Sequence, residues 1–125
     1  MLAAKALNVM SETDRIRLSK ASGTVRVHWG DQWIAETQRA RCLTETGYPD
    51  RLYIPMDDVA ADTLVVSETT THCPFKGDAT YYHIHIDGDQ LDDAAWCYAK
   101  PISEVADIAG HLAFDHAALV IQHDA

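Results

Sequence analysis

The sequence lacks any long apolar run. Its 125 residues are 47% hydrophobic, but no stretch approaches the roughly 20 consecutive apolar residues that a helix needs to cross a bilayer. The opening residues 1–14 contain some apolar side chains and one lysine, with no small-residue cleavage site after them. We therefore expect neither membrane association nor a secretion signal.

Basic residues are also scarce. Ten Lys and Arg stand against nineteen Asp and Glu, which leaves a net charge of −9. Such a chain repels phosphate backbones, because affinity for nucleic acid comes largely from cationic side chains. The composition therefore predicts that nucleic acid is not a partner.

Cysteine is limited to Cys42, Cys73 and Cys97, and no pair has the C-x-x-C spacing. An odd number without close pairs favours neither a disulfide framework nor a cysteine zinc site. The only close histidine pair is His83 and His85, which alternation places on the solvent-facing side of their strand and for which the sequence places no third ligand. We expect no bound metal and a cytoplasmic location, and the sequence identifies no cofactor.

Repeats, low-complexity tracts and linkers rich in proline or glycine are absent too, so nothing indicates an internal boundary. The predicted organisation is a flexible extension over residues 1–13 and one β-rich domain over residues 14–125. Alternating apolar and polar residues predict many short strands. They cover residues 15–18, 24–29, 33–35, 40–43, 51–54, 63–66, 80–86, 94–98 and 118–122.

Helix signals are few. Pro55–Val59 and Ser103–Ala109 have the composition of short helices, the second ending at Gly110. The predicted fold is therefore mainly β, a compact antiparallel domain that is barrel-like or tent-like, with one or two short helices. The residues on the apolar phase of these segments form the predicted core: Val25, Val27, Ile54, Tyr82, Ile84, Ile86, Trp96, Ile108 and Phe114.

Four stretches, "RCLTETGYPDRLYIPMDDV", "TTTHCPFKGDATYY", "DAAWCYAKP" and "IAGHLAF", occur in this order. Together with the opening "DRIRLSKASGTVRVHWGDQWIAET" they resemble domain of unknown function family 427, small bacterial and fungal proteins, over about residues 14–123. The resemblance implies a compact β-rich fold and supplies no activity. A nucleotidyltransferase-like label is sometimes attached to that family. Nucleotidyl transfer needs carboxylates that hold Mg²⁺, and no Asp pair here follows the required Gly-Ser turn.

The segment His72-Cys73-Pro74-Phe75-Lys76-Gly77 has two interpretations. Pro74 and Gly77 suit a tight turn that leads into the next strand. Alternatively, Lys76 and His72 favour a thiolate at Cys73, or Lys76 and the N–H groups of the turn receive an anionic ligand. The match of this motif to the resembled family favours a site.

Other candidates could complete such a site. Trp96 and Tyr98 share a strand face, either as core residues or as the wall of a pocket with Lys76 at its polar end. Glu45 follows a strand, either as a solvated acid or as a base and partner of Lys76. Arg39 and Arg41 could bind an anion, although exposed charges are common on strands.

Two functions remain open from the sequence. The first is a pocket for a small polar or anionic molecule, with Lys76, Trp96 and Tyr98 as binding residues. In an enzyme, the catalytic residues would be either Cys73 as nucleophile with His72 as its partner, or Glu45 working with Lys76 as acid and base. The alternative is a non-catalytic β module that acts through surface contacts or dimerisation. The chain would be a monomer or a homodimer.

Overall fold

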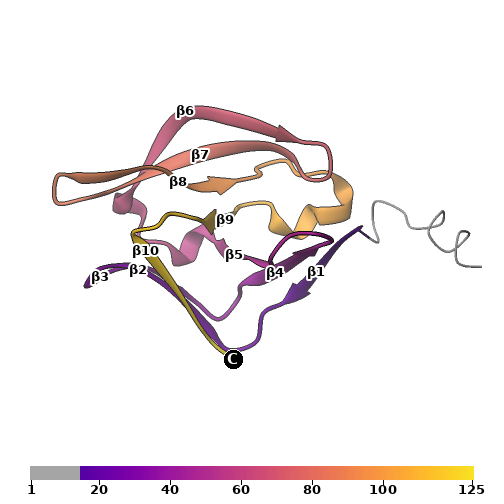
Figure 1. Cartoon of the computed structure of the whole chain (residues 1–125), viewed down its shortest axis with the longest axis horizontal. Coiled ribbons are helices and arrows are strands. Elements are labelled where there is room, and N and C mark those ends of the chain that lie inside the picture. The colour runs from indigo at the N-terminus through magenta and orange to yellow at the C-terminus, as the bar shows by residue number, and fades with distance from the viewer. Residues whose placement is uncertain (1–14) are drawn as a thin grey trace, which may run out of the picture.

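The chain forms two antiparallel β-sheets (Figure 1). The computed structural model describes residues 15–125, so the predicted extension over residues 1–13 lies outside the described residues. The larger sheet has seven strands. In spatial order they are β1 (Ile16–Lys20), β4 (Arg41–Glu45), β5 (Arg51–Pro55), β9 (His111–Phe114), β8 (Asp89–Cys97), β7 (Gly77–Ile86) and β6 (Leu64–Cys73).

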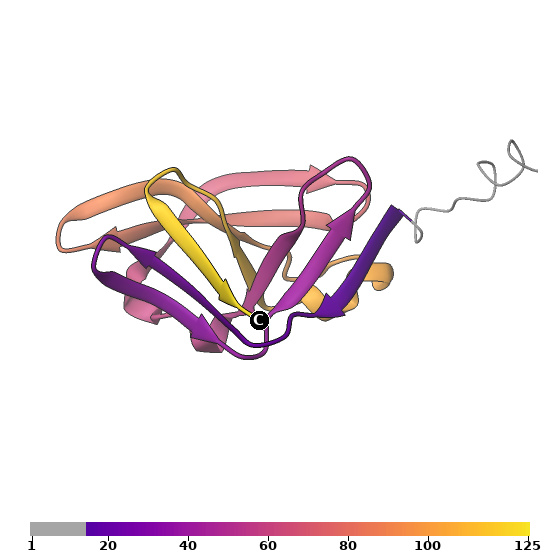
Figure 2. The same ribbon diagram turned by 60° about the horizontal axis from the view of Figure 1, so that its bottom comes forward.

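The smaller sheet has three strands and lies across the lower part of the view in Figure 1. Its central strand is β2 (Thr24–Trp29), which pairs with β3 (Gln32–Thr37) and with β10 (Leu119–Asp124). Turned by 60°, the molecule shows β10 running beside β2 from the far end of the sequence (Figure 2). This pairing joins the two ends of the described chain.

The main core lies between the two sheets. It joins apolar residues of β2 and β3 to residues of β5, β7, β8 and β9 in the larger sheet. Six of the nine predicted core residues are fully buried: Val25, Val27, Ile54, Ile84, Ile108 and Phe114. The prediction was wrong for Tyr82, Ile86 and Trp96, which are only partly buried.

A second core covers the opposite face of the larger sheet. Neighbouring strand residues alternate between the two cores, as their period of two requires. Ile54 lies in the main core and Tyr53 in the second, while Leu112 and Ala113 divide in the same way. The second core therefore gives the larger sheet two apolar faces.

Three short 3₁₀ helices replace the two helices expected. They are η1 (Met56–Asp58), η2 (Ala61–Thr63) and η3 (Ser103–Ile108). η3 contributes Val105 and Ile108 to the second core, and Gly110 follows it with a φ of +71°. That left-handed conformation suits glycine and turns the chain into β9.

The mainly β antiparallel fold with little helix is confirmed, although the sheets do not close into a barrel among residues 15–125. Strand β9 was not predicted, and β6 extends further, to Cys73. The Asp87-Gly88 turn between β7 and β8 has positive φ at both residues, as a two-residue hairpin requires. Within the described residues no helix has the length and apolar character to span a membrane.

Candidate functional site

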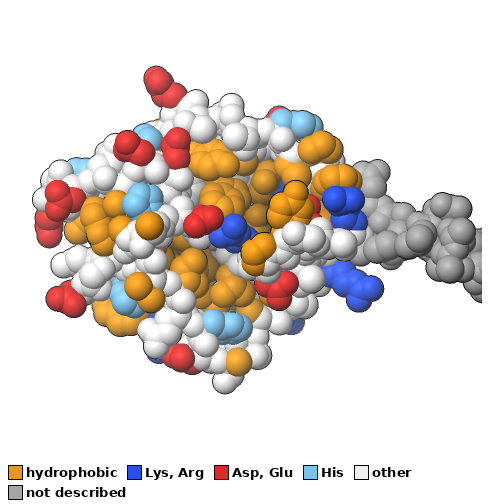
Figure 3. Space-filling view, in the orientation of Figure 1, with side chains coloured by type: hydrophobic (Ala, Val, Ile, Leu, Met, Phe, Trp, Pro, Cys, Tyr) orange, Lys and Arg blue, Asp and Glu red, His pale blue; other side chains and the backbone are white. Residues whose placement is uncertain are grey.

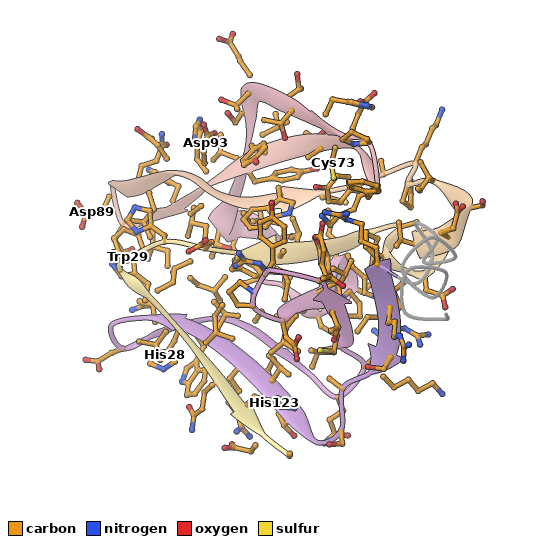
Figure 4. The ribbon with its side chains drawn as sticks, turned by 45° about the vertical axis from the view of Figure 1, so that its right-hand side comes forward. His28, Trp29, Cys73, Asp89, Asp93 and His123 are labelled. Atoms are coloured by element: carbon orange, nitrogen blue, oxygen red, sulfur yellow. The ribbon has the colours of Figure 1, made fainter. Side chains whose placement is uncertain are left out.

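A pocket of about 420 Å³ opens on the face of the larger sheet that carries the second core. Its walls come from β4, β5, β7, β8 and the turn between β6 and β7. In Figure 4, Cys73 lies at the end of β6, far from His28 and His123 on the smaller sheet. The six residues proposed from the sequence all line this pocket: Glu45, His72, Cys73, Lys76, Trp96 and Tyr98.

The turn between β6 and β7 fixes one wall of the pocket. The Lys76 N–H donates to the Cys73 carbonyl at 3.1 Å, and the Lys76 carbonyl accepts from the Ile102 N–H at 2.9 Å. Gly77 has a φ of +120°, and a Cβ built there would lie 3.3 Å from the Lys100 carbonyl oxygen. Glycine is therefore required for both conformation and space, and the turn is held against residues 100–102.

Lys76 and Glu45 form an ion pair in the pocket. Lys76 Nζ lies 2.8 Å from Glu45 Oε1, and the two side chains are only 13% and 11% exposed. Burial lowers the pKa of Lys76, but the hydrogen bond to Glu45 and the charges of Cys73 and Glu45 outweigh it. The pKa of Lys76 therefore lies above its ordinary value of 10.5, and the side chain is a cation at neutral pH.

Cys73 lies next to this ion pair. Lys76 Nζ is 3.6 Å from Cys73 Sγ, close enough to donate a hydrogen bond to sulfur. An ammonium group at this distance stabilises a thiolate. Burial raises the pKa of both the Cys42 and Cys97 thiols.

His72 points away from this cluster. Its Nδ1 lies 2.7 Å from Asp78 Oδ1, and both side chains are mostly exposed. Adjacent strand residues face opposite sides, which separates the imidazole from the thiol of Cys73. His72 thus contributes to the rim of the pocket, with Asp78 as its partner.

Aromatic rings form the floor and walls. The Trp96 and Tyr81 ring centroids lie 5.9 Å apart, and those of Tyr53 and Tyr98 lie 6.5 Å apart. Trp96 Nε1 donates to the Tyr53 hydroxyl at 3.4 Å. Burial raises the pKa of Tyr53 and of Tyr98 above their ordinary value of 10.0, so both are neutral phenols at physiological pH.

Two arginines that the sequence interpretation did not single out also line the pocket. The Arg51 guanidinium lies 4.9 Å from the Trp96 ring centroid, and that of Arg15 lies 4.5 Å from the Phe75 ring. Among the described residues, the buried Nε of Arg15 has no hydrogen-bond partner. Alternation in "RLY" could have placed Arg51 and Tyr53 on one face, but nothing in the sequence placed either beside Trp96.

Charge and aromaticity concentrate in this pocket. Six of the chain's ten aromatic residues line it, together with three cations and a single carboxylate, Glu45. On the face shown in Figure 3, hydrophobic side chains gather toward the centre and right with basic groups among them, while most acidic groups lie near the edge. An acidic chain thereby contains a locally basic, aromatic hollow.

Arg39 and Arg41 lie elsewhere. Both line a second hollow of about 730 Å³, with Lys20 and His111. Arg39 is paired there with Asp58 at 3.2 Å. The hydrogen bond from Thr37 to Asp58, supported by Arg39, lowers the pKa of that carboxyl. These side chains do not contribute to the pocket around Cys73.

The histidine pair on β7 is not arranged as expected. His85 is exposed, but His83 is partly buried and accepts a hydrogen bond from the Asp93 N–H at 3.0 Å. The expected solvent-facing alternation was wrong for His83 because the pairing of β7 with β8 shifts between Tyr82 and Ile84. Within residues 15–125 no three His, Cys, Asp or Glu side chains are grouped to hold a metal ion.

Comparison with known proteins gives one relationship. Residues 17–124 match the family NTP_transf_9, described as a domain of unknown function (DUF427). No curated protein matches the chain.

Proposed function

Because the chain belongs to the DUF427 family, whose description assigns no activity, we propose a function from the pocket itself: it binds a small anionic molecule that has a planar part. The observation that carries this proposal is the collection of three cations and six aromatic rings around one carboxylate. The pocket volume of about 420 Å³ falls within the range of small-molecule sites, roughly 300–1,000 Å³.

Each component has a place in this proposal. Lys76 is the charged end of the pocket, although its ion pair with Glu45 reduces the charge that it offers. Arg15 and Arg51 supply guanidinium groups, which suit planar anions such as carboxylates. Arg51 also pairs with Asp115 at 3.4 Å, which reduces the charge that it offers. The Nε of Arg15, which has no hydrogen-bond partner within residues 15–125, is a donor that a ligand oxygen would satisfy.

The rings of Trp96 and Tyr98 bind the planar part of the ligand. Aromatic pairs prefer offset or tilted arrangements with centroids about 4.5–7 Å apart, and the existing pairs in the pocket already have such spacing. Trp96 is only partly buried, so part of its ring remains free to contact a ligand.

The same pocket supports catalysis in outline. Cys73 is the nucleophile, and Glu45 acts with Lys76 rather than alone, because the two are hydrogen-bonded. His72 has the least support as a catalytic partner, since its ring is bonded to Asp78 on the exposed side.

Ligand binding can be tested by tryptophan fluorescence. Benzoate should quench the emission saturably, whereas benzamide, which has the same ring without the charge, should bind at least about tenfold more weakly, the equivalent of about 1.4 kcal/mol. Trp96→Leu should abolish the response. Trp33→Leu is the matched control, because Trp33 is exposed on the smaller sheet. Equal quenching by benzoate and benzamide, or loss of the response with Trp33 only, would contradict the proposal.

A further inference from the structure

Cys73, Lys76 and Glu45 form a continuous row of reactive groups. Lys76 Nζ donates to Glu45 Oε1 at 2.8 Å and to Cys73 Sγ at 3.6 Å. The lysine comes from the turn between β6 and β7, whereas the glutamate ends β4 on another part of the sheet. The ammonium group is thus held at one place by two partners from separate elements.

This arrangement is costly as a purely structural device. Removing two charges from water costs several kcal/mol per ion, and apolar residues of similar size often stabilise a protein equally well. A turn over residues 73–77 needs Gly77 for its conformation but does not need a thiol. The side chains of the row also line a pocket with room for a small molecule.

We propose that Cys73 is the nucleophile of an acyl transfer, with Lys76 as its proton donor and acceptor and Glu45 as the residue that positions Lys76. This inference rests on the proposed function, because the acyl substrate occupies the same pocket. The substrate class is an ester or thioester whose acyl or leaving group is planar and anionic.

The first half of the reaction forms an acyl-enzyme. The Cys73 thiolate attacks the carbonyl carbon, a C–S bond forms, and the carbonyl π electrons move to oxygen. The Lys76 ammonium stabilises this oxyanion. As the intermediate collapses, the bond to the leaving group breaks, and the leaving group takes a proton from Lys76.

The second half regenerates the protein. The neutral Lys76 amine accepts a proton from water, and the hydroxide formed attacks the thioester carbon. The C–S bond breaks, Cys73 leaves as thiolate and Lys76 is again an ammonium. The net reaction is an ester plus water giving an acid and an alcohol. Lys76 fills both roles because the proton that it gives to the leaving group in the first half is replaced by the proton that it takes from water in the second.

The acyl class follows from the charge beside the sulfur. Attack on a carbonyl carbon places negative charge on an oxygen two bonds from the attacking sulfur, within reach of the ammonium group that contacts Cys73 Sγ. A cation fixed there before reaction stabilises that charge without reorganisation. His72 does not serve as the base, because its ring lies on the exposed side of β6, next to Asp78 and away from the thiol of Cys73.

The test uses 4-acetoxybenzoate as the probe, an acetyl ester whose leaving group is planar and anionic. The full-length protein should release a burst of one 4-hydroxybenzoate per chain, followed by steady turnover, with one acetyl group located on Cys73 by mass spectrometry. Cys73→Ser should abolish the burst. Cys42→Ser is the matched control and should retain it, because Cys42 lies on β4 outside the pocket lining.

Glu45→Gln tests the positioning role. It should lower kcat at least about tenfold without raising KM, because the ligand-binding rings and arginines are unchanged. If Lys76→Met does not fold, the double variant Lys76→Met with Glu45→Gln removes both charges. It should unfold cooperatively in urea, which shows that it is folded, yet give no burst.

The outcomes separate the two proposals. Acetylation of Cys73 no faster than that of Cys42, or an acetyl-enzyme that does not turn over, would overturn the acyl-transfer inference. If Cys73→Ser and the wild type still bind benzoate in that case, the binding function stands. Absence of benzoate binding in the wild type would remove the binding function itself, whatever the burst shows.

Discussion

Lys76 and Glu45 lie 31 positions apart in the chain, yet their charged groups meet at 2.8 Å with little exposure to solvent. The contact joins the turn between β6 and β7 to the end of β4. It therefore links the turn to a distant strand of the same sheet.

Removing one partner of this pair should be more harmful than removing both. Lys76→Met leaves the Glu45 carboxylate without its cation, and we expect a loss of about 3 kcal/mol in the free energy of unfolding. Lys76→Met with Glu45→Gln should recover at least about half of that loss. Urea denaturation at neutral pH measures both variants. Equal destabilisation by the single and double variants would contradict a role for the unpaired charge.

Alkaline pH should destabilise the fold through the groups around the pocket. Lys76, Tyr53 and Tyr98 all have pKa values raised in the folded protein. The stability that these groups contribute is fully present below their ordinary pKa values of 10.5 for lysine and 10.0 for tyrosine. It is lost as pH rises through the raised pKa values of the folded protein. Stability should therefore fall above about pH 10.

Tyr98→Phe is the variant that isolates one of these groups. Phenylalanine cannot ionise, so the free energy of unfolding of the variant should fall less between pH 8 and pH 11 than that of wild type. This pH range brackets the pKa of an ordinary tyrosine, about 10. Denaturant unfolding at the two pH values gives the comparison. If the variant loses as much free energy of unfolding between the two pH values as wild type does, the buried Tyr98 hydroxyl is not part of the alkaline transition.

Iodoacetamide should distinguish the three cysteines. Cys73 lies in the pocket with an ammonium 3.6 Å from its sulfur, whereas burial raises the pKa of Cys42 and Cys97. At pH 7 we expect labelling of Cys73 at least about tenfold faster than labelling of Cys42, and Cys97 last. Peptide mass mapping over time supplies the rates. Similar rates at Cys73 and Cys42 would indicate a purely structural cysteine.

Trp96→Ala should lower the free energy of unfolding less than a substitution in the main core does. Trp96 is a pocket wall that is partly buried, whereas Phe114 is 1% exposed between the sheets. We expect Phe114→Ala to lower the free energy of unfolding by about 3–5 kcal/mol and Trp96→Ala to lower it by less than about 3 kcal/mol. Thermal and urea unfolding of the two variants provide the measurement. A larger loss for Trp96→Ala would make it a core residue instead.

Local patterns predicted most of the strands because alternation is a local property. β2 was found with its bounds, since Thr24–Trp29 alternates along its length. β9 was missed because three of its four residues are buried, so the period of two is hidden. The outer part of β6 was missed because this edge strand is polar from Ser67 to His72.

The site was predictable to a smaller degree. The motif around Cys73 and the alternation that puts Trp96 and Tyr98 on one strand face indicated candidate site residues. The structure brings these residues to one pocket. Arg51 and Tyr53 join them only because β9 and β8 follow β5 in the sheet. Strand order depends on pairings between distant segments, which no local pattern contains.

Strand β9 also has a kinetic consequence. It pairs with β5 on one side and with β8 on the other. It therefore joins the strands that carry Glu45 and Tyr53 to Trp96 on β8 and to the β6–β7 hairpin, whose turn carries Lys76. The β4–β5 and β7–β8 hairpins each consist of neighbouring segments and can form early, in about 1–10 μs for a hairpin. The pocket then assembles only when residues 111–114 insert between them, which makes its appearance a late, slow event governed by long-range contacts.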